Sequence, residues 1–270
     1  MEIRSLVNTP LQEIIDCLLI SFEDYFVPMP SDINYWRDRF KGARVDLDLS
    51  YGAFDAEKLV GFIIHGIDNY NGLRTAFNTG TGVIPGFRGR KVVDQIYTYA
   101  IPQLQQKGIQ QCALEVIQDN HRAIRVYERI GFSITRNFLC FKGQLTQATG
   151  AGNVIPVSFE SAQHLREDHQ YYSWDNVKAA IQTAGPIYKT YLVLEDGKEL
   201  GFFTVNPKNG YLAQYEAEVE AFPHLLAAIQ SIHPEVRVNN VDQERAEVIL
   251  FFLSAGLDNH IDQYEMIMSI

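Results

Sequence analysis

The chain has 270 residues, of which 46% are hydrophobic and 21% charged, a composition typical of a globular protein that can bury a core. This length exceeds that of one modest domain, so we expect one large or two small domains. The formal net charge is −10, from 23 Lys and Arg against 33 Asp and Glu. A field of that sign disfavours nucleic acids and anionic membranes as partners.

The sequence carries no signal for export, for a membrane span or for a metal. Charges or prolines interrupt every apolar run before it is long enough to cross a bilayer. Residues 1–4 continue directly into a strand-like pattern, without the basic and apolar parts of a signal peptide, so we expect a cytoplasmic location. Cys17, Cys112 and Cys140 are widely spaced in apolar contexts, which favours reduced core cysteines over metal ligands.

The first half alternates between strand and helix patterns, and Gly108 and Gly131 end two of the helices. The pattern predicts an α/β fold. The expected elements are a strand at Glu2–Val7, helices at Leu11–Phe22 and Asn34–Phe40, a hairpin of Leu49–Phe54 with Lys58–Ile67, a strand at Thr75–Ile84, a helix at Lys91–Lys107, a strand at Gln111–Gln118, a helix at His121–Ile130 and a strand at Phe132–Gly143.

The second half repeats the first in weakened form. Residues 144–153 are rich in Thr, Gly, Ala and Asn and lack periodicity, so we place a linker there, between domains 1–143 and 154–270. Residues 198–202 match residues 58–62, each after a hairpin turn. We interpret the chain as a tandem duplication whose second copy is degenerate.

The most specific segment is the basic turn that follows the strand ending near Val83. Pro85 and Gly86 end that strand, and Arg88-Gly89-Arg90-Lys91 opens the next helix. A helix N-terminus directs backbone N–H groups and the positive end of its dipole at one place, which favours an anion such as a phosphate or pyrophosphate. Cations there oppose the dipole, so we favour an anion site over a solvated helix start.

Two further residues are candidates for the same site as this turn. Asn120 stands directly before the helix His121–Ile130, where helix capping alone would explain it. Tyr127 lies about two turns into that helix, where a tyrosine is more often a half-buried packing residue than a catalyst. The basic turn, Asn120 and Tyr127 are each weak evidence for a functional site when taken alone. Their order along the chain is the more specific feature.

Together the segments resemble the GNAT superfamily of N-acetyltransferases. In that family a strand ends in a Val-x-Pro-like segment, Arg/Gln-x-x-Gly-x-Gly/Ala starts the main helix, and Asn-x-x-Ala-x-x-x-Tyr-(Glu)-x-x-Gly-Phe follows. This chain has Val83-Ile84-Pro85 and Arg88, and it matches the last signature in full from Asn120 to Phe132. The resemblance implies two GNAT-like domains in tandem, each with a mixed sheet and flanking helices.

The resemblance also implies acetyl-CoA as co-substrate and no metal. Pantetheine would bond the backbone around Gly82–Val83 where two strands splay apart, and the pyrophosphate would lie on the turn Arg88–Val93, with Arg88 and Arg90 as charge partners. Tyr127 would protonate the departing thiolate, because a phenol stays protonated at neutral pH. The implied catalytic residue is Tyr127, and the implied cofactor-binding residues are Gly82, Val83, Arg88, Gly89, Arg90, Lys91, Val92, Val93, Asn120, Ala123 and Tyr127.

The chain departs from the family pattern at three points. Lys91 and Val93 stand where the family has Gly and Gly/Ala, so the backbone must approach the pyrophosphate differently. Residues 74–82 contain no carboxylate to act as general base. The base is left open between an ordered water and a residue elsewhere, such as Glu23, Asp24 or Tyr25.

These observations predict an N-acetyltransferase that transfers acetyl to a primary amine by direct attack in a ternary complex. The alternative is a non-catalytic acyl-CoA-binding or regulatory module. A P-loop nucleotide site is disfavoured because Arg90-Lys91-Val92 lacks the hydroxyl that would hold magnesium. The acceptor stays open between a small-molecule amine, a peptide N-terminus and a lysine side chain. The expected oligomeric state is a monomer with an internal pseudo-dimer, or a homodimer.

Overall fold

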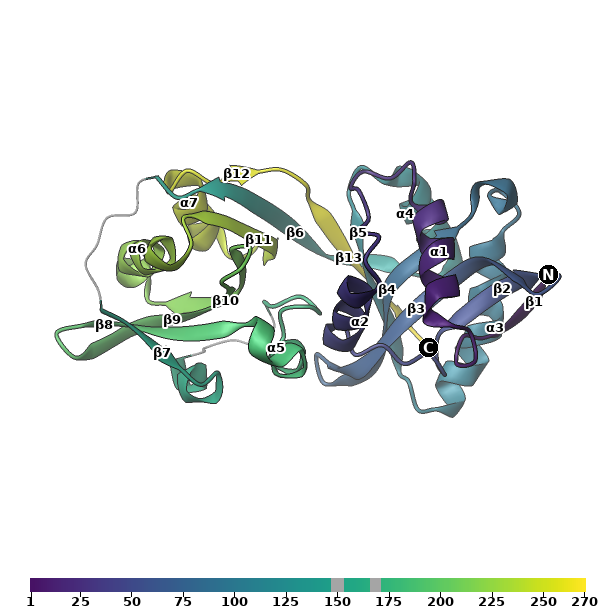
Figure 1. Cartoon of the computed structure of the whole chain (residues 1–270), viewed down its shortest axis with the longest axis horizontal. Coiled ribbons are helices and arrows are strands. Elements are labelled where there is room, and N and C mark those ends of the chain that lie inside the picture. Colours follow the sequence, from purple (N-terminus) through teal and green to yellow (C-terminus); the bar gives the residue numbers. More distant parts are fainter. Residues whose placement is uncertain (147–152, 166–170) are drawn as a thin grey trace. The chain divides into compact units, whose positions relative to one another are not determined.

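The computed structural model describes residues 1–146, 153–165 and 171–270, and the chain within them forms two compact units (Figure 1). The first unit comprises Met1–Thr135 with Glu265–Ile270, and the second comprises Arg136–Tyr264. Most of the linker expected at 144–153 lies outside the described residues. Within the described residues, no helix combines the length and the apolar character needed to cross a membrane.

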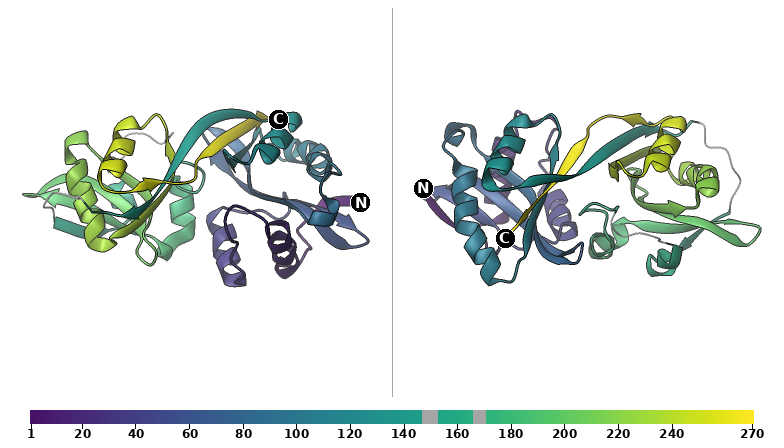
Figure 2. Two further views of the ribbon diagram at one scale, coloured as in Figure 1. Left: turned by 90° about the horizontal axis from the view of Figure 1, so that it is seen from above. Right: turned by 180° about the vertical axis from the view of Figure 1, so that it is seen from behind.

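The first unit is a mixed sheet between two pairs of helices. The pairs β1–β2, β2–β3 and β3–β4 are antiparallel, and β4–β5 is parallel. Figure 2 shows α1 (Leu11–Ser21) and α2 (Ile33–Gly42) on one face, with α3 (Val92–Gln106) and α4 (His121–Ile130) on the other. The strand order is β1 (Glu2–Ser5), β2 (Tyr51–Asp55), β3 (Lys58–Tyr70), β4 (Leu73–Val83), β5 (Gln111–Ile117) and β13 (Gln263–Ser269).

Local chemistry sets the ends of these helices. Asp32 caps α2 by accepting a hydrogen bond from the Asn34 amide, and Gly131 ends α4 at a φ of +123°. The helix α4 has the bounds expected from the sequence. Beneath the helices, large apolar side chains such as Ile14, Phe62 and Ile96 are fully buried, which provides the hydrophobic stabilisation of the unit.

The second unit repeats this arrangement. Its parallel pair is β10–β11 and its other pairs are antiparallel. The strand order is β6 (Ser133–Gln144), β11 (Glu235–Asp242), β10 (Tyr211–Ala217), β9 (Lys198–Asn206), β8 (Lys189–Glu195) and β7 (Asn153–Val157), with β12 (Asp258–Asn259) also on β6. Its helices are α5 (Lys178–Ala184), α6 (Phe222–Ile232) and α7 (Ala246–Ser254).

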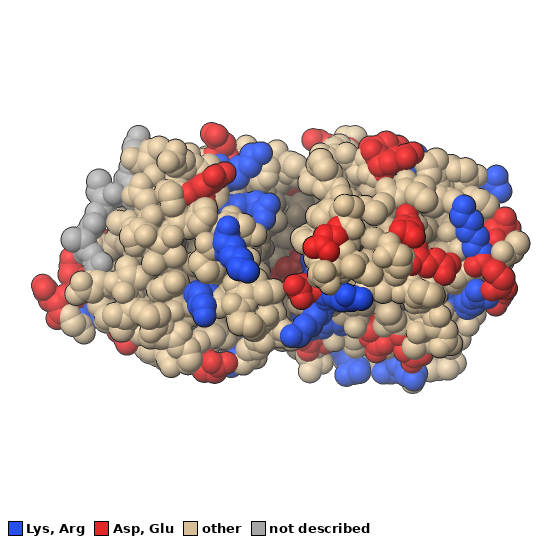
Figure 3. Space-filling model, viewed as in Figure 1, with Lys and Arg blue, Asp and Glu red and all other residues tan. Residues whose placement is uncertain are grey.

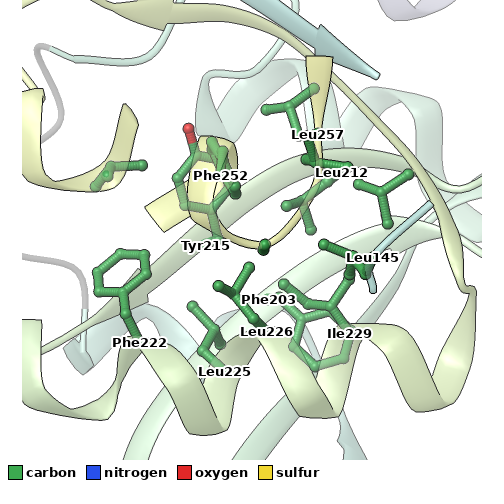
Figure 4. Close-up of a cluster of buried hydrophobic side chains, with 14 of the residues drawn as sticks. Leu145, Phe203, Leu212, Tyr215, Phe222, Leu225, Leu226, Ile229, Phe252 and Leu257 are labelled. Carbon is green, nitrogen blue, oxygen red and sulfur yellow. The ribbon is translucent and has the colours of Figure 1, made fainter. Parts of the chain in front are cut away.

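The core of the second unit lies between its sheet and the helices α6 and α7 (Figure 4). Phe222 and Phe251, from the two helices, stack with ring centroids 5.1 Å apart. The side chains labelled in the figure are Leu145, Phe203, Leu212, Tyr215, Phe222, Leu225, Leu226, Ile229, Phe252 and Leu257. The second half therefore keeps a packed core of its own.

The boundaries expected at 143 and 154 are wrong, because the last strand of each half pairs in the other unit. Strand β6 follows α4 in the chain, but from Arg136 it belongs to the second unit, where it pairs with β11. Strand β13 ends the second half, but Glu265–Ile270 returns to the first unit beside β5. An apolar pattern predicts a strand but not its partner, since pairing uses backbone groups that all residues share.

A buried carboxylate holds the returning strand in place. Glu265 on β13 is 1% exposed, and its oxygens accept hydrogen bonds from Tyr70 at 2.6 Å and Thr135 at 2.9 Å. The Ile270 amide adds a bond to the Gln110 carbonyl at 3.0 Å. Partners of this kind compensate the cost of burying a carboxylate.

We expect Tyr70→Phe to lower the free energy of unfolding by about 1–3 kcal/mol, because the buried Glu265 carboxylate loses a donor. Urea unfolding followed by circular dichroism would measure this. Tyr35→Phe is the matched control, since Tyr35 is 45% exposed. Equal stability of the two variants would contradict the role of this contact.

Candidate active site

The site begins where β4 and β5 stop pairing. Their parallel register runs from Thr75 with Gln111 to Asn78 with Leu114, and both strands continue beyond it. On its other side β4 carries a one-residue bulge, since Asn78 pairs with His65 but Gly80 pairs with Ile64. A bulge bends its strand and increases the local twist. The strand edge beyond Asn78 is therefore turned away from β5, which opens the gap that the resemblance implies.

The side chain of Asn78 holds this bulge. Its Oδ1 accepts a hydrogen bond from the Gly80 amide at 3.1 Å, and its Nδ2 donates to Thr81 at 2.6 Å and to the Tyr97 hydroxyl at 3.1 Å. Asn78 is 6% exposed, so these bonds satisfy a buried amide. Sequence reasoning missed Asn78 and Thr81. The signal that pointed to them is the polar run Asn78–Gly82 within an otherwise apolar strand.

The start of α3 has the features of an anion site. Lys91 is its N-cap, with φ 55° and ψ 36°, and no side chain caps the helix. The first amides of a helix lack partners within it, so those of Val92 and Val93 can serve a ligand. Arg90 and Lys91 are exposed. Lys91 therefore adopts the left-handed conformation that glycine takes most easily, which agrees with the family's glycine at this position.

The Arg88 side chain is engaged by partners within the first unit. Its guanidinium donates two hydrogen bonds to the Asp24 carboxylate, at 2.6 and 2.7 Å. It also donates to the carbonyls of Val83 and Ser21. This side chain ties the end of β4 to the segment after α1. These contacts give Arg88 a structural role, and its expected role as a charge partner of the pyrophosphate stays a prediction.

The backbone groups that face the gap also differ from the expected pair. The Ile84 amide bonds to the Val60 carbonyl on β3, and backbone groups alternate along a strand, so those of Gly82 face β3 as well. Thr81 and Val83 face the gap instead. A Cβ on Gly82 would lie 2.6 Å from the Phe62 ring, so this glycine serves close packing.

Asn120 caps α4 and lies near a tyrosine. Its Oδ1 accepts a hydrogen bond from the Ala123 amide at 3.2 Å, which places Ala123 in the first turn of the helix. Burial raises the pKa of Tyr25, from the segment after α1, and the nearby Asn120 side chain lowers it. Capping accounts for Asn120 structurally.

Tyr127, on α4, is buried, with 9% of its surface exposed. Burial raises the pKa of Tyr127, while hydrogen bonds from Thr81 and Asn78 lower it and Tyr25 raises it further. Its ring packs edge-on against Phe132, with centroids 5.7 Å apart. The net shift is upward, so the phenol holds its proton at neutral pH.

The candidates for a general base are poorly suited to that role. The Arg88 guanidinium lowers the pKa of Asp24, so this carboxylate is a weaker base than usual. Burial raises the pKa of Tyr25, which keeps its phenol protonated. These shifts disfavour Asp24 and Tyr25 as bases. Glu23 and an ordered water stay open, and the proton acceptor stays unassigned. Among the described residues, no cluster of His, Cys, Asp and Glu could hold a metal ion.

The second unit provides an internal comparison for this site. Each unit has a bulge that leaves one residue unpaired. In the first unit this residue is Val60, between the pairs Ala53–Gly61 and Phe54–Leu59. In the second unit it is Leu200, between the pairs Val193–Gly201 and Leu194–Glu199. The registers then make the residues at the gap correspond one by one. Thr81, Gly82 and Val83 correspond to Tyr215, Glu216 and Ala217.

In the second unit this gap is closed by the unit's own side chains. Arg245 caps α7 at φ −82° and ψ 55°, as Asn120 caps α4 at φ −82° and ψ 59°. Arg245 pairs with Glu216 at 2.8 Å. The Tyr172 hydroxyl bonds both the amide and the carbonyl of Tyr215, at 3.1 and 3.0 Å. Tyr172 thus occupies the strand edge that the first unit leaves open.

Residues 11–132 match the model of the acetyltransferase (GNAT) family. That range contains the bulged strand, the basic turn and Tyr127. The whole chain has the fold of two GNAT-like domains in tandem, as its solved relatives show. No protein of curated function matches it in sequence.

Three solved structures share this fold over nearly the whole chain. A putative acetyltransferase from Pyrococcus horikoshii has a TM-score of 0.70 at 12% identity, over 100% of this chain and 89% of that one. A tandem GNAT protein from the clavulanic acid biosynthesis pathway has 0.71 at 14%, over 99% and 98%. A GCN5-related N-acetyltransferase from Sphaerobacter thermophilus has 0.67 at 12%, over 99% and 95%.

We expect the Arg88–Asp24 contact to make stability depend on pH. The pKa of Asp24 is lowered in the folded state, so its contribution is present above the ordinary aspartate pKa of about 4 and is lost as the pH falls through the lowered value. Urea unfolding of the wild type and Asp24→Asn should differ at neutral pH and converge in acid. Glu23→Gln is the neighbouring control. A difference that persists in acid would contradict the assignment.

Proposed function

We propose that the chain is an acetyl-CoA-dependent N-acetyltransferase acting on a primary amine, with the reaction in the first unit. The observation that carries the proposal is the buried Tyr127 beside a gap between parallel strands. The open α3 N-terminus in the same unit supports it, because it supplies amides and the two exposed cations Arg90 and Lys91 for a pyrophosphate. The residues at the gap thus fit the cofactor that the family implies.

Acetyl-CoA supplies an acyl group on a thiolate leaving group. The residues of the chain hold the cofactor and protonate the departing sulfur. Thr81 and Val83 present the strand edge to the pantetheine arm, although the Val83 carbonyl also accepts a bond from Arg88. The amine nitrogen bonds to the acyl carbon as the carbon–sulfur bond breaks, and Tyr127 gives its proton to the sulfur. The amine proton leaves to water, and the Tyr127 phenolate is reprotonated from solvent.

We infer that only the first unit binds acetyl-CoA. In the second unit Glu216 stands where Gly82 does, and a carboxylate repels phosphates. Tyr172 also takes the backbone groups that a cofactor arm would use. The role of the second unit in acceptor binding stays a prediction, as do the oligomeric state and the cytoplasmic location.

The charge of the protein restricts the class of amine acceptor only broadly. Acidic and basic side chains are intermixed over the face shown in Figure 3, while the net charge of −10 mildly favours cationic amines. Small-molecule amines, peptide N-termini and lysine side chains all meet this condition. A panel with one member of each class would decide among them.

We expect Tyr127→Phe to lower kcat about a hundredfold, because general acid catalysis contributes factors of that order. Thiol release from acetyl-CoA against the amine panel would measure it, and Tyr99→Phe, an exposed tyrosine on α3, is the control. Unchanged turnover in Tyr127→Phe would overturn the catalytic assignment. CoA binding without turnover for any amine would favour a non-catalytic acyl-CoA-binding module.

We expect isothermal titration with CoA to give one site per chain. Lys91→Glu should weaken binding at least about tenfold, because a charged contact to phosphate is lost and a repulsive one is gained. Lys107→Glu makes the same charge change at the other end of α3 and should leave affinity unchanged. Two sites per chain would contradict the closed second unit.

A further inference from the structure

A groove on the surface of the first unit joins the start of α3 to an acidic side chain. The residues that line it are Arg90, Lys91, Asp94, Gln95, Thr98 and Tyr99. Arg90 and Lys91 belong to the basic turn, whereas Asp94 lies in the first turn of α3. Asp94 therefore places a carboxylate beside the amides and the cations that are proposed to hold a pyrophosphate.

This position of Asp94 favours the helix and disfavours the ligand. A carboxylate in the first turn is stabilised by the positive end of the helix dipole. The same dipole attracts a phosphate, so Asp94 and a bound pyrophosphate are like charges at one end of α3. Asp94 lies about 5 Å along the helix axis from Lys91, and physiological salt does not fully screen a repulsion over that distance.

Arg129, on α4, engages both oxygens of this carboxylate. Its Nε donates to Oδ1 of Asp94 at 2.6 Å, and its Nη2 donates to Oδ2 at 2.8 Å. Two parallel bonds of this kind make a strong and geometrically specific pair. The hydrogen bond from Arg129 lowers the pKa of Asp94, so at neutral pH both groups are ionised and the pair is neutral overall.

We propose that Arg129 is a positioning residue for cofactor binding, which acts by cancelling the charge of Asp94 beside the pyrophosphate site. Asp94 stabilises the start of α3, and Arg129 allows this without repulsion of an anion at the same place. Arg129 needs no contact with the ligand for this effect. The inference rests on the proposed function for the identity of the anion, and on the two hydrogen bonds for its mechanism.

The test compares two uncharged substitutions that break the same contact with opposite changes of charge. Arg129→Gln leaves Asp94 unpaired and should weaken CoA binding about fivefold, the size of one charge contact near the surface. Asp94→Asn leaves Arg129 unpaired and should strengthen binding by a similar factor. The double variant restores neutrality, so its affinity should return to that of the wild type. Isothermal titration with CoA measures all four proteins.

Lys107→Gln is the matched control, because it removes the same charge about 20 Å from Asp94 along α3, beyond the Debye length at about 0.1 M salt. Its affinity for CoA should equal that of the wild type. At about 1 M salt, where the Debye length falls to about 3 Å, the differences between the variants should shrink. A contact that only ties α3 to α4 predicts another pattern, in which both single variants weaken binding and the double variant does not recover.

The neutralising role is overturned if Asp94→Asn weakens CoA binding. It is also overturned if the double variant stays as weak as Arg129→Gln, since Arg129 would then contact the ligand itself. In turnover, Arg129→Gln should raise KM for acetyl-CoA about fivefold and leave kcat nearly unchanged, because the pair acts on binding and not on the reacting atoms.

Titration with inorganic pyrophosphate separates this role from the proposed function. Opposite shifts of pyrophosphate affinity in Arg129→Gln and Asp94→Asn, in a chain that acetylates no amine, would refute the proposed function and leave the role of Arg129 standing. Turnover in the wild type without these opposite shifts would refute the role of Arg129 alone. A wild type that binds neither CoA nor pyrophosphate would refute both.

Discussion

The structure depends on one constraint, which is that β4 must stop pairing with β5 while it stays paired with β3. The bulge at Asn78 meets it. The register with β3 continues on both sides of the extra residue, while the register with β5 ends. The Asn78 side chain compensates the interrupted ladder by bonding the Gly80 amide and Thr81. The same short segment thereby opens the gap and orients the groups at its wall.

The two units show how little separates an open gap from a closed one. They share strand order, bulge position and the backbone angles of the helix cap, so the scaffold is the same. In the first unit the corresponding positions hold Gly82 and Asn120, which are uncharged and form no ion pair there. Glutamate and arginine fill the gap in the second unit, where Glu216 and Arg245 form a salt bridge. A buried pair of this kind is costly to break, because either charge alone would be left without a partner.

The sequence predicted more of the site's location than of its contacts. Tyr127 and Asn120 were found because their spacing matches a family signature within one helix, where geometry follows from sequence. The contact of Arg88 with Asp24 was not predicted because the two residues lie 64 positions apart in the chain, and a guanidinium serves a carboxylate as readily as a phosphate. Asn78 was missed because its role requires a bulge, which depends on the pairing of two strands.

The sequence by itself determined the elements, the basic turn at Lys91 and the repeat of one fold along the chain, because periodicity, capping and turn chemistry act within a few residues. The tertiary structure decided which strand completes which sheet, since β6 and β13 exchange places between the units. It also decided that one gap is open and the other filled. Those outcomes depend on backbone pairing and on side chains far apart in the chain, for which no local pattern exists.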